Sequence, residues 1–175
     1  DEVDASIWKR IPEDNVSGVI TNFQSVFYGD GTWIAVGKHG VNDGAIYTSI
    51  NTKHWYEQAN ITAKNINGIV FNEVRKKFYA VGDDGLFMTS SDGVSWTEYQ
   101  TLSPNVRLNN INVLKNGNEV IGGDNGNIFE VVLSNDSADN DKVINRKFHN
   151  ASMLDSSSVT TIAEGPVYMV AGNSN

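Results

Sequence analysis

The sequence has 175 residues, with 21 acidic and 13 basic side chains, a net charge of −8 and no cysteine. The absence of cysteine excludes a disulfide framework and thiolate metal sites, and the acidic balance argues against nucleic acid, whose partners present a large basic surface. No run of about 18 apolar residues is present, so no membrane insertion is predicted, and the length suits one domain of ordinary size.

The first part of the chain is predicted to form four β-strands in sequence. The predicted elements are a strand at 19–28, a turn at 29–31, a strand at 33–36, a turn at 38–44, a strand at 45–49 and a fourth strand at Trp55 and Tyr56. Apolar runs separated by Gly-containing turns are typical of hairpins. Ahead of them, residues 5–11 are predicted to form another fourth-position strand, because Trp8 precedes Trp55 by 55 − 8 = 47 residues.

The same order of elements recurs along the rest of the chain. The predicted strands are 69–71, 78–81, 86–90 and 96–99 in the second unit, 111–114, 120–121, 127–133 and 143–148 in the third, and 159–163 and 167–170 in the fourth. Gly, Asp and Asn occupy the turns, because they tolerate the positive φ that tight hairpins require. No segment has a sustained helical period of apolar residues, so essentially no helix is predicted.

Each unit also contains a small apolar pair closed by glycine. Gly37, Gly82, Gly123 and Gly172 are separated by 82 − 37 = 45, 123 − 82 = 41 and 172 − 123 = 49 residues. The four-stranded blades of a β-propeller recur at about 40 to 50 residues. The sequence therefore predicts an all-β fold, a β-propeller of four-stranded antiparallel blades with about four blades in this chain.

A turn motif links the third and fourth strands of the first two units. Its residues are Ser49, Asn51 and Trp55 in the first unit and Ser90, Asp92, Gly93 and Trp96 in the second. A short Asp or Asn side chain caps backbone amides at such a bend, glycine accepts the unusual dihedral angle, and tryptophan covers the flank of the blade. A structural role is therefore predicted for these residues.

The motif resembles the Asp-box, or bacterial neuraminidase repeat, of sialidase-type β-propellers. That repeat is Ser or Thr, any residue, Asp, any residue, Gly, any residue, Thr or Ser, and Trp. The copy at 90–96 is one residue shorter, and the copy at 49–55 has Asn51 for Asp and Thr52 for Gly. The acidic, Asn-rich, cysteine-free composition is similar to that of bacteriophage tail or virion proteins and bacterial surface proteins.

The repeat leaves two interpretations of the whole chain. One is a small ring of about four blades, and the other is an arc of a larger propeller, whose open faces and edges need cover from further chain or another subunit. The predicted organisation is a single β-propeller domain or fragment over 1–175, with units at approximately 12–58, 59–100, 101–148 and an incomplete one at 149–175, and with 5–11 as a closing outer strand.

Polar side chains gather in the loops that follow the second strands, at one end of the predicted blades. The candidate binding residues are Lys38, His39, Asn42, Asp43, Asp83, Asp84, Asp124 and Asn125. A ring of carboxylates and amides can hydrogen-bond sugar hydroxyls or coordinate a divalent cation, which prefers oxygen ligands. Asp-Gly and Asn-Gly are also turn formers, so a purely structural role is the alternative. No catalytic residue and no other cofactor are predicted.

The function predicted from these features is a non-enzymatic binding or structural scaffold module. It would be part of a phage tail, virion or bacterial surface protein that engages a protein or glycan surface, located outside the cell or in a virion and assembled in an oligomer or a larger chain. Two alternatives stay open: a glycan-active, sialidase-like enzyme of which this chain is a fragment, and an envelope or organelle assembly factor. A sialidase gathers several arginines, and only Arg107 is predicted at the loop end.

Overall fold

The computed structural model describes residues 21–40, 43–58, 61–99, 105–133, 143–147, 158–164 and 169–174. The predicted strand at 5–11 lies outside them. The described strands form four sheets, which we call blades. Blade 1 consists of β1 (Thr21–Gly29), β2 (Thr32–His39), β3 (Asp43–Ser49) and β4 (Tyr56–Gln58), and blade 2 of β5 (Ile66–Asn72), β6 (Lys77–Gly82), β7 (Phe87–Ser90) and β8 (Thr97–Glu98). Blade 3 consists of β9 (Leu108–Val113), β10 (Glu119–Gly123), β11 (Ile128–Leu133) and β12 (Val143–Lys147), and blade 4 of β13 (Ser158–Glu164) and β14 (Met169–Ser174).

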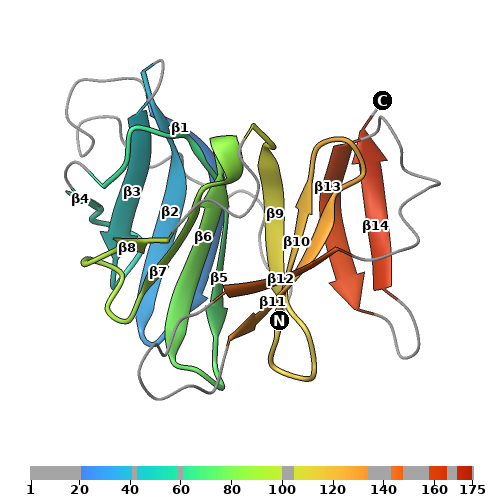
Figure 1. Cartoon of the computed structure of the whole chain (residues 1–175). Coiled ribbons are helices and arrows are strands. Elements are labelled where there is room, and N and C mark those ends of the chain that lie inside the picture. Colours follow the sequence, from blue (N-terminus) through green and yellow to red (C-terminus); the bar gives the residue numbers. More distant parts are fainter. Residues whose placement is uncertain are drawn as a thin grey trace, which may run out of the picture.

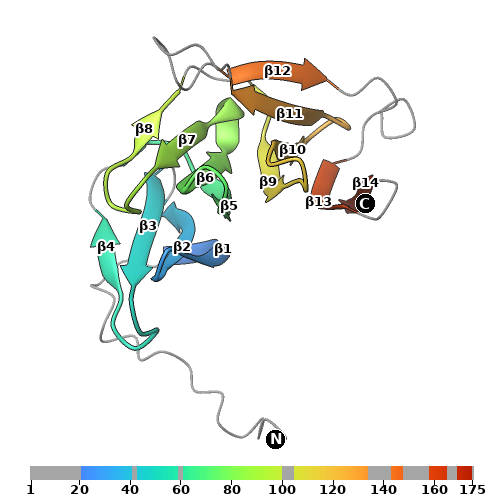
Figure 2. The ribbon, with the colours of Figure 1, turned by 90° about the horizontal axis from the view of Figure 1, so that it is seen from below.

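The blades stand side by side in an open arc (Figures 1 and 2). Within each blade, strands that are adjacent in the chain pair antiparallel. The first strands β1, β5, β9 and β13 contact one another in series along the inner side of the arc, and β4, β8 and β12 lie on its outer side. The predicted fold class is confirmed: the chain is all-β and forms part of a β-propeller. Among the described residues, the helical content is one 3-10 turn, η3 (Asp83–Gly85).

The fourth strands begin one residue later than the tryptophans that were predicted to open them. β4 starts at Tyr56 and β8 at Thr97. The indole N–H of Trp55 donates to the carbonyl of Thr52, and that of Trp96 donates to the carbonyl of Gly93, each at 3.1 Å. Because both indoles are bound to the preceding turn, the tryptophans belong to the turn rather than to the strand.

Each first strand contains a β-bulge near its beginning. Its pairing with the second strand skips one residue, and the skipped residues are Gln24, Asn67, Asn109 and Thr160. A bulge leaves one residue outside the ladder and re-aims its side chain. The fourth bulge also corrects the predicted equivalence of the glycines. In blade 4 the residue before the bulge pairs with Asn173, whereas in blade 3 it pairs with Gly123. Gly172 is therefore equivalent to Gly122 and not to Gly123.

The bulge explains why glycine recurs at the end of the second strand. Gly37, Gly82 and Gly123 each pair with the residue that precedes a bulge. A Cβ atom at these positions would come within 3.0 Å of the carbonyl oxygens of Asn22, Asn65 and Arg107, respectively. Two of these carbonyls also accept a backbone hydrogen bond from the residue after the glycine, Asp83 and Asp124. Close approach of two backbones therefore requires glycine here.

Apolar cores fill the space between neighbouring blades. The core between blades 1 and 2 contains Ile34, Val36, Ile46, Ile66, Ile69, Phe71, Phe78, Ala80, Leu86 and Met88. The core between blades 2 and 3 contains Val70, Tyr79, Val81, Phe87, Leu108, Ile111, Ile121, Phe129 and Val131. Successive residues of a strand point to opposite faces, so β5, β6 and β7 of blade 2 supply both cores and are buried along almost their whole length. Burial of these faces holds the arc together.

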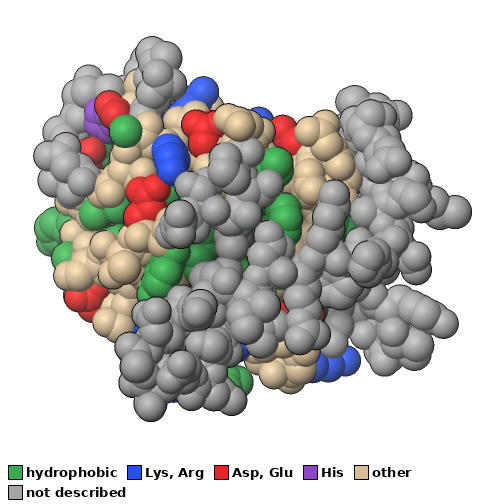
Figure 3. Space-filling view, in the orientation of Figure 1, with side chains coloured by type: hydrophobic (Ala, Val, Ile, Leu, Met, Phe, Trp, Pro, Cys, Tyr) green, Lys and Arg blue, Asp and Glu red, His purple; other side chains and the backbone are tan. Residues whose placement is uncertain are grey.

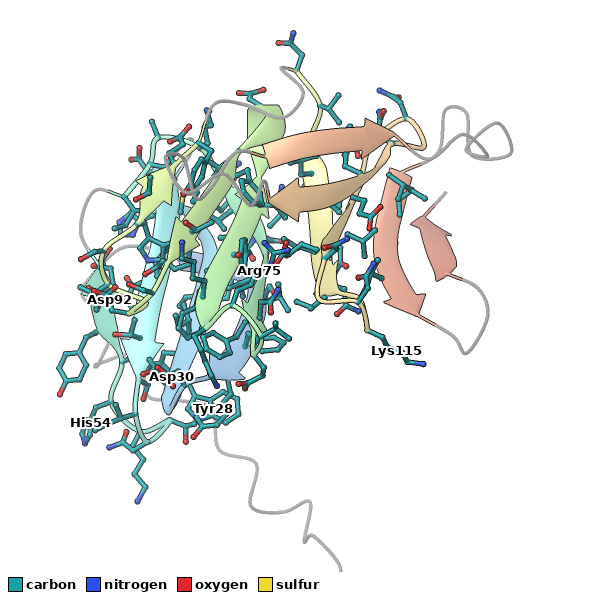
Figure 4. The ribbon with its side chains drawn as sticks, turned by 60° about the horizontal axis from the view of Figure 1, so that its bottom comes forward. Tyr28, Asp30, His54, Arg75, Asp92 and Lys115 are labelled. Atoms are coloured by element: carbon teal, nitrogen blue, oxygen red, sulfur yellow. The ribbon has the colours of Figure 1, made fainter. Side chains whose placement is uncertain are left out.

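A buried carboxyl group links blades 2 and 3 at the end of the blades opposite η3. The side chain of Glu119 is fully buried, and Asn72 donates a hydrogen bond to its Oε1 atom. Arg75 Nε lies 3.6 Å from the same oxygen. Burial raises the pKa of Glu119 above its ordinary value, and the contacts with Asn72, Arg75 and Tyr79 oppose that shift. Figure 4 shows Arg75 at the junction of the two blades.

The close approach at Gly82 predicts a large effect of a single added methyl group. Gly82→Ala places a Cβ against the backbone of Asn65, which cannot rotate away, and is expected to lower the free energy of unfolding by about 3 kcal/mol or more. Gly31→Ala is the control, because its Cβ meets nothing within 4 Å and only its φ of +79° is strained; its cost is about 1 kcal/mol. Equal losses in urea unfolding would contradict this explanation.

Glu119 predicts a specific pH dependence of stability. Because its pKa is raised in the folded protein, the unfolded chain loses this proton first as the pH rises. Stability therefore falls over the window between the ordinary value of 4.5 and the raised pKa. Glu119→Gln should remove this fall when unfolding is measured by denaturant titration across the acid to neutral range. Exposed Glu73→Gln is the control and should follow the wild-type profile. A Glu119→Gln profile parallel to that of the wild type would contradict the assignment.

Candidate functional site

We call the end of the blades that carries η3 and the loops after the second strands the loop end. It lies uppermost in Figure 1, and acidic and basic side chains lie along it in Figure 3. The inner strands β5 and β9 begin there, next to the axis of the arc. Their bulges bring polar side chains to this end.

Asp83 is the centre of a polar network between blades 2 and 3. Asn65 Nδ2 donates to its Oδ2 atom and Asn67 Nδ2 to its Oδ1 atom, both at 2.8 Å. Arg107 Nε lies 3.2 Å from Oδ1, and Arg107 Nη2 donates to Asn67 Oδ1 at 3.4 Å. Asn67 also donates to the carbonyl of Leu108 at 2.9 Å. The bulge residue Asn67 thus joins its own loop to the next blade.

The same arrangement is repeated one blade further along. The bulge residue Asn109 donates to Asp124 Oδ1 at 2.9 Å and to the carbonyl of Val159 in blade 4 at 3.3 Å. Asp124 and Asn109 are therefore the equivalents of Asp83 and Asn67. Blade 1 lacks the pair, because Gln24 and Lys38 occupy its two positions, and Gln24 donates to Asn22 instead. The repeated polar pair belongs to the middle of the described arc.

Three residues at this end, Arg107, Asp84 and Asn125, have solvent-exposed side chains. Arg107 is 52% exposed although it binds Asp83. Asp84 is exposed and adopts a left-handed backbone with φ of 52°, and Asn125 is its counterpart in blade 3 with φ of 57°. Both loops therefore present one polar residue outward, directly after the aspartate that is bound to the bulge.

The candidates from blade 1 form a separate group. Lys38 and His39 end β2, and Asp43 begins β3 opposite His39. His39 Nδ1 lies 3.3 Å from Glu57 on the outer strand β4, so it faces the outer side of the blade. Asn42 lies outside the described residues. The other candidates, Asp83, Asp84, Asp124 and Asn125, lie in the loops of blades 2 and 3 at the loop end.

Asn65, Asn67 and Asn109 are not among the residues predicted from the sequence, and Arg107 is predicted at this end without a binding role. A signal was present: Asn67 and Asn109 are 109 − 67 = 42 residues apart, close to the 124 − 83 = 41 residues between their aspartate partners. It was hidden because asparagine is also an ordinary turn residue. Their importance depends on the bulge, which the apolar pattern does not reveal.

In the described part of the chain, no group of three His, Cys, Asp or Glu side chains gathers in a way that could hold a metal ion. No helix in that part has the length and apolar character that crossing a bilayer requires.

The turns between the third and fourth strands lie at the other end of the blades, at the outer rim (Figure 4). Asp92 Oδ1 accepts the backbone N–H groups of Val94 and Ser95 at 2.8 and 2.7 Å, and Ser90 Oγ accepts that of Gly93 at 2.8 Å. The backbone hydrogen bonds from Ser95 and Val94 hold the pKa of Asp92 below its ordinary value.

The turn of blade 1 has the same hydrogen bonds with different residues. Asn51 Oδ1 accepts the N–H groups of Lys53 and His54, and Ser49 Oγ accepts that of Thr52. Thr52 adopts φ of 62° where Gly93 adopts 76°. An amide oxygen thus replaces the carboxylate, and a non-glycine residue accepts the left-handed backbone.

The equivalence of Asn51 and Asp92 predicts the effect of substitutions in blade 2. Asp92→Ala leaves two amides without an acceptor and should cost about 1 kcal/mol at neutral pH. Asp92→Asn should retain most of that stability, because Asn51 makes the same bonds. Because the folded-state pKa is lowered, this carboxylate adds stability that is fully present above the ordinary value of 3.8 and is lost as the pH falls from there through the lowered pKa. Chemical unfolding at neutral and acid pH checks this, and an Asn variant as unstable as the Ala variant would contradict it.

Comparison with known proteins shows a similarity of fold. No protein-family model and no curated protein sequence matches the chain. Among solved structures, the chain is similar to an exo-1,5-alpha-L-arabinanase from a bovine ruminal metagenomic library, with 12% sequence identity and a TM-score of 0.47. The match covers 82% of this chain and 61% of the arabinanase chain. The likeness at this identity is one of fold alone.

The match to an enzyme contradicts the predicted function, a non-enzymatic binding or scaffold module of a phage tail, virion or bacterial surface protein. The site geometry supplies a physical reason for the correction. A passive scaffold needs only turn-forming loops, whereas here a carboxylate and a guanidinium are held together by amides beside the axis.

Proposed function

We propose that this chain is part of a glycan-active β-propeller enzyme that binds a sugar at the loop end. The observation that carries the proposal is the Asp83, Asn67 and Arg107 network, which fixes a half-exposed guanidinium beside the axis of the arc. Open β-structures with short polar loops commonly bind ligands where a few oriented polar groups converge. We also propose that this part functions within a longer chain or together with a second subunit.

The chemistry of Arg107 suits a hydroxyl-rich ligand. A guanidinium has five N–H donors in a fixed plane, and two contacts, with Asp83 and Asn67, orient it. The remaining donors can bind sugar hydroxyls or a carboxylate without a further loss of side-chain freedom, because the ion pair already holds the plane. Asp83 is bound by three groups, so its proposed role is to position Arg107.

The outward carboxylate of Asp84 is the candidate for proton transfer. No hydrogen bond from another described residue reaches it, unlike Asp83 and Asp124, so it is free to meet a glycosidic oxygen. Hydrolysis of a glycosidic bond needs a second carboxyl group about 5 to 10 Å away across the sugar. Asp124 of blade 3 is the described candidate for that role, and chain outside the described residues is the other source.

A sialidase-like activity is the finer form of the proposal that the Asp-box resemblance favours. Arg75 lies at the opposite end and Arg146 is on the outer strand β12, so Arg107 is the described arginine that can reach a substrate carboxylate. One arginine does not make the cluster that such enzymes use. We therefore propose a neutral glycan as the first class to test, with arabinan and sialyllactose as probes, in an enzyme that acts outside the cell.

The proposal is tested by measuring glycan binding and cleavage with the complete gene product. Oligosaccharide binding is followed by calorimetry and cleavage by release of reducing ends. Arg107→Ala should weaken binding about tenfold or more, since a hydrogen bond to a charged group contributes about 1.5 to 3 kcal/mol. Asp84→Ala should lower turnover and leave the dissociation constant within about twofold.

Lys115→Ala is the matched control, because this cation lies in the β9–β10 turn of the same blade at the opposite end (Figure 4). It should leave both measurements unchanged. Unaltered binding and turnover in Arg107→Ala would place the sugar site elsewhere. Absence of turnover on all glycans, with binding retained, would refute the enzyme proposal and leave a lectin.

A further inference from the structure

The inner strand of blade 1 presents an apolar face at the open side of the arc. We call the open face the side of blade 1 formed by Phe23, Val26, Tyr28, Trp33, Ala35 and Tyr47. Tyr28 and Trp33 stack with ring centroids 5.0 Å apart, and Phe23 contacts Tyr47 edge to face at 5.3 Å. None of these side chains is charged, and Val26 and Tyr28 are 54% and 53% exposed.

The pairing register shows which residues of blade 2 occupy the equivalent places. Val26, Ala35 and Tyr47 lie side by side across β1, β2 and β3, as Ile69, Ala80 and Met88 do across β5, β6 and β7. Tyr28 pairs with Trp33 as Phe71 pairs with Phe78, and both are ring contacts. The two rows therefore form the same face of two successive blades.

Ala35 and Tyr47 are buried like their counterparts Ala80 and Met88, but burial differs sharply at the inner-strand positions of the two faces. Ile69 and Phe71 are each 4% exposed, because Ile34, Val36 and Ile46 of blade 1 cover them. Gly29 at the end of β1 lies directly on Phe71, where a Cβ would collide with the ring. The equivalent Val26 and Tyr28 have no described neighbour above them. Exposed apolar side chains that lie next to one another on one face are characteristic of an interface.

We infer that the open face binds one further propeller blade of the same protein, a four-stranded antiparallel sheet packed against it as blade 1 packs against blade 2. The chemistry of the occupant follows from that interface. It presents uncharged aliphatic side chains at the places of Ile34, Val36 and Ile46, and a residue without a bulky side chain at the place of Gly29, above Tyr28. Sheet faces pack in this way when both are apolar.

Oxidative footprinting of the complete gene product that contains residues 1–175 tests the inference, with its mass measured by light scattering in the same sample. Tyr28 should react with hydroxyl radicals as slowly as buried Phe71 and much more slowly than exposed Tyr56. Tyr28→Lys should lower the melting temperature, since it puts a charge into the interface. Ile50→Lys is the control at an exposed apolar residue outside the face and should leave the melting temperature unchanged.

Slow reaction of Tyr28 in a protein with the mass of one chain would support the inference. Reaction of Tyr28 at the rate of Tyr56 would overturn it, because the face would then be open to solvent. Protection that appears only in a sample with the mass of two or more chains, and that is lost on dilution, would also overturn it. In that case a second copy, rather than a further blade of the same chain, covers the face.

Discussion

The close approach of the first-strand backbone to the glycine at the end of the second strand is the contact on which the rest of the blade depends. In blades 1, 2 and 3 it lies where a bulge interrupts the pairing of the first strand with the second. Glycine is needed at Gly37, Gly82 and Gly123 so that the backbones can meet. The position of the following loop is fixed by this contact, and so is the polar residue that begins the loop.

The same bulge connects folding with the proposed chemistry. In blades 2 and 3 the asparagine skipped by the bulge donates hydrogen bonds to a backbone carbonyl of the next blade and to the aspartate in the loop of its own blade. Each asparagine therefore satisfies a backbone carbonyl at the blade junction and fixes a carboxylate at the loop end. The polar arrangement beside the axis is thus held by groups that also hold the arc, which gives it the rigidity that ligand recognition requires.

The sequence was sufficient to predict the fold class, because apolar runs, Gly-rich turns and a regular period are all local signals. It also placed strands close to their observed bounds. It did not reveal the bulges, since Asn67 and Asn109 fall within strands and carry no pattern of their own. Arg107 precedes β9 in a segment without a motif, and its pairing with Asp83 of the preceding blade is a contact between blades. Such contacts between blades depend on which residues of neighbouring strands pair with each other. The spacing of glycines along the sequence does not reveal a shift of one residue in that pairing, such as the one at Gly172.

The skipped residue of each bulge stands outside the ladder, so the sheet does not dictate its identity. Gln24, Asn67, Asn109 and Thr160 are accordingly a series of positions, one in each blade, that accommodate different side chains. Exchanging these few side chains would alter the pattern of donors and acceptors around the axis without changing a strand, a turn or a core residue. In blades 2 and 3 these positions also join neighbouring blades through Asn67 and Asn109, so a change of ligand preference there would be coupled to the cohesion of the arc.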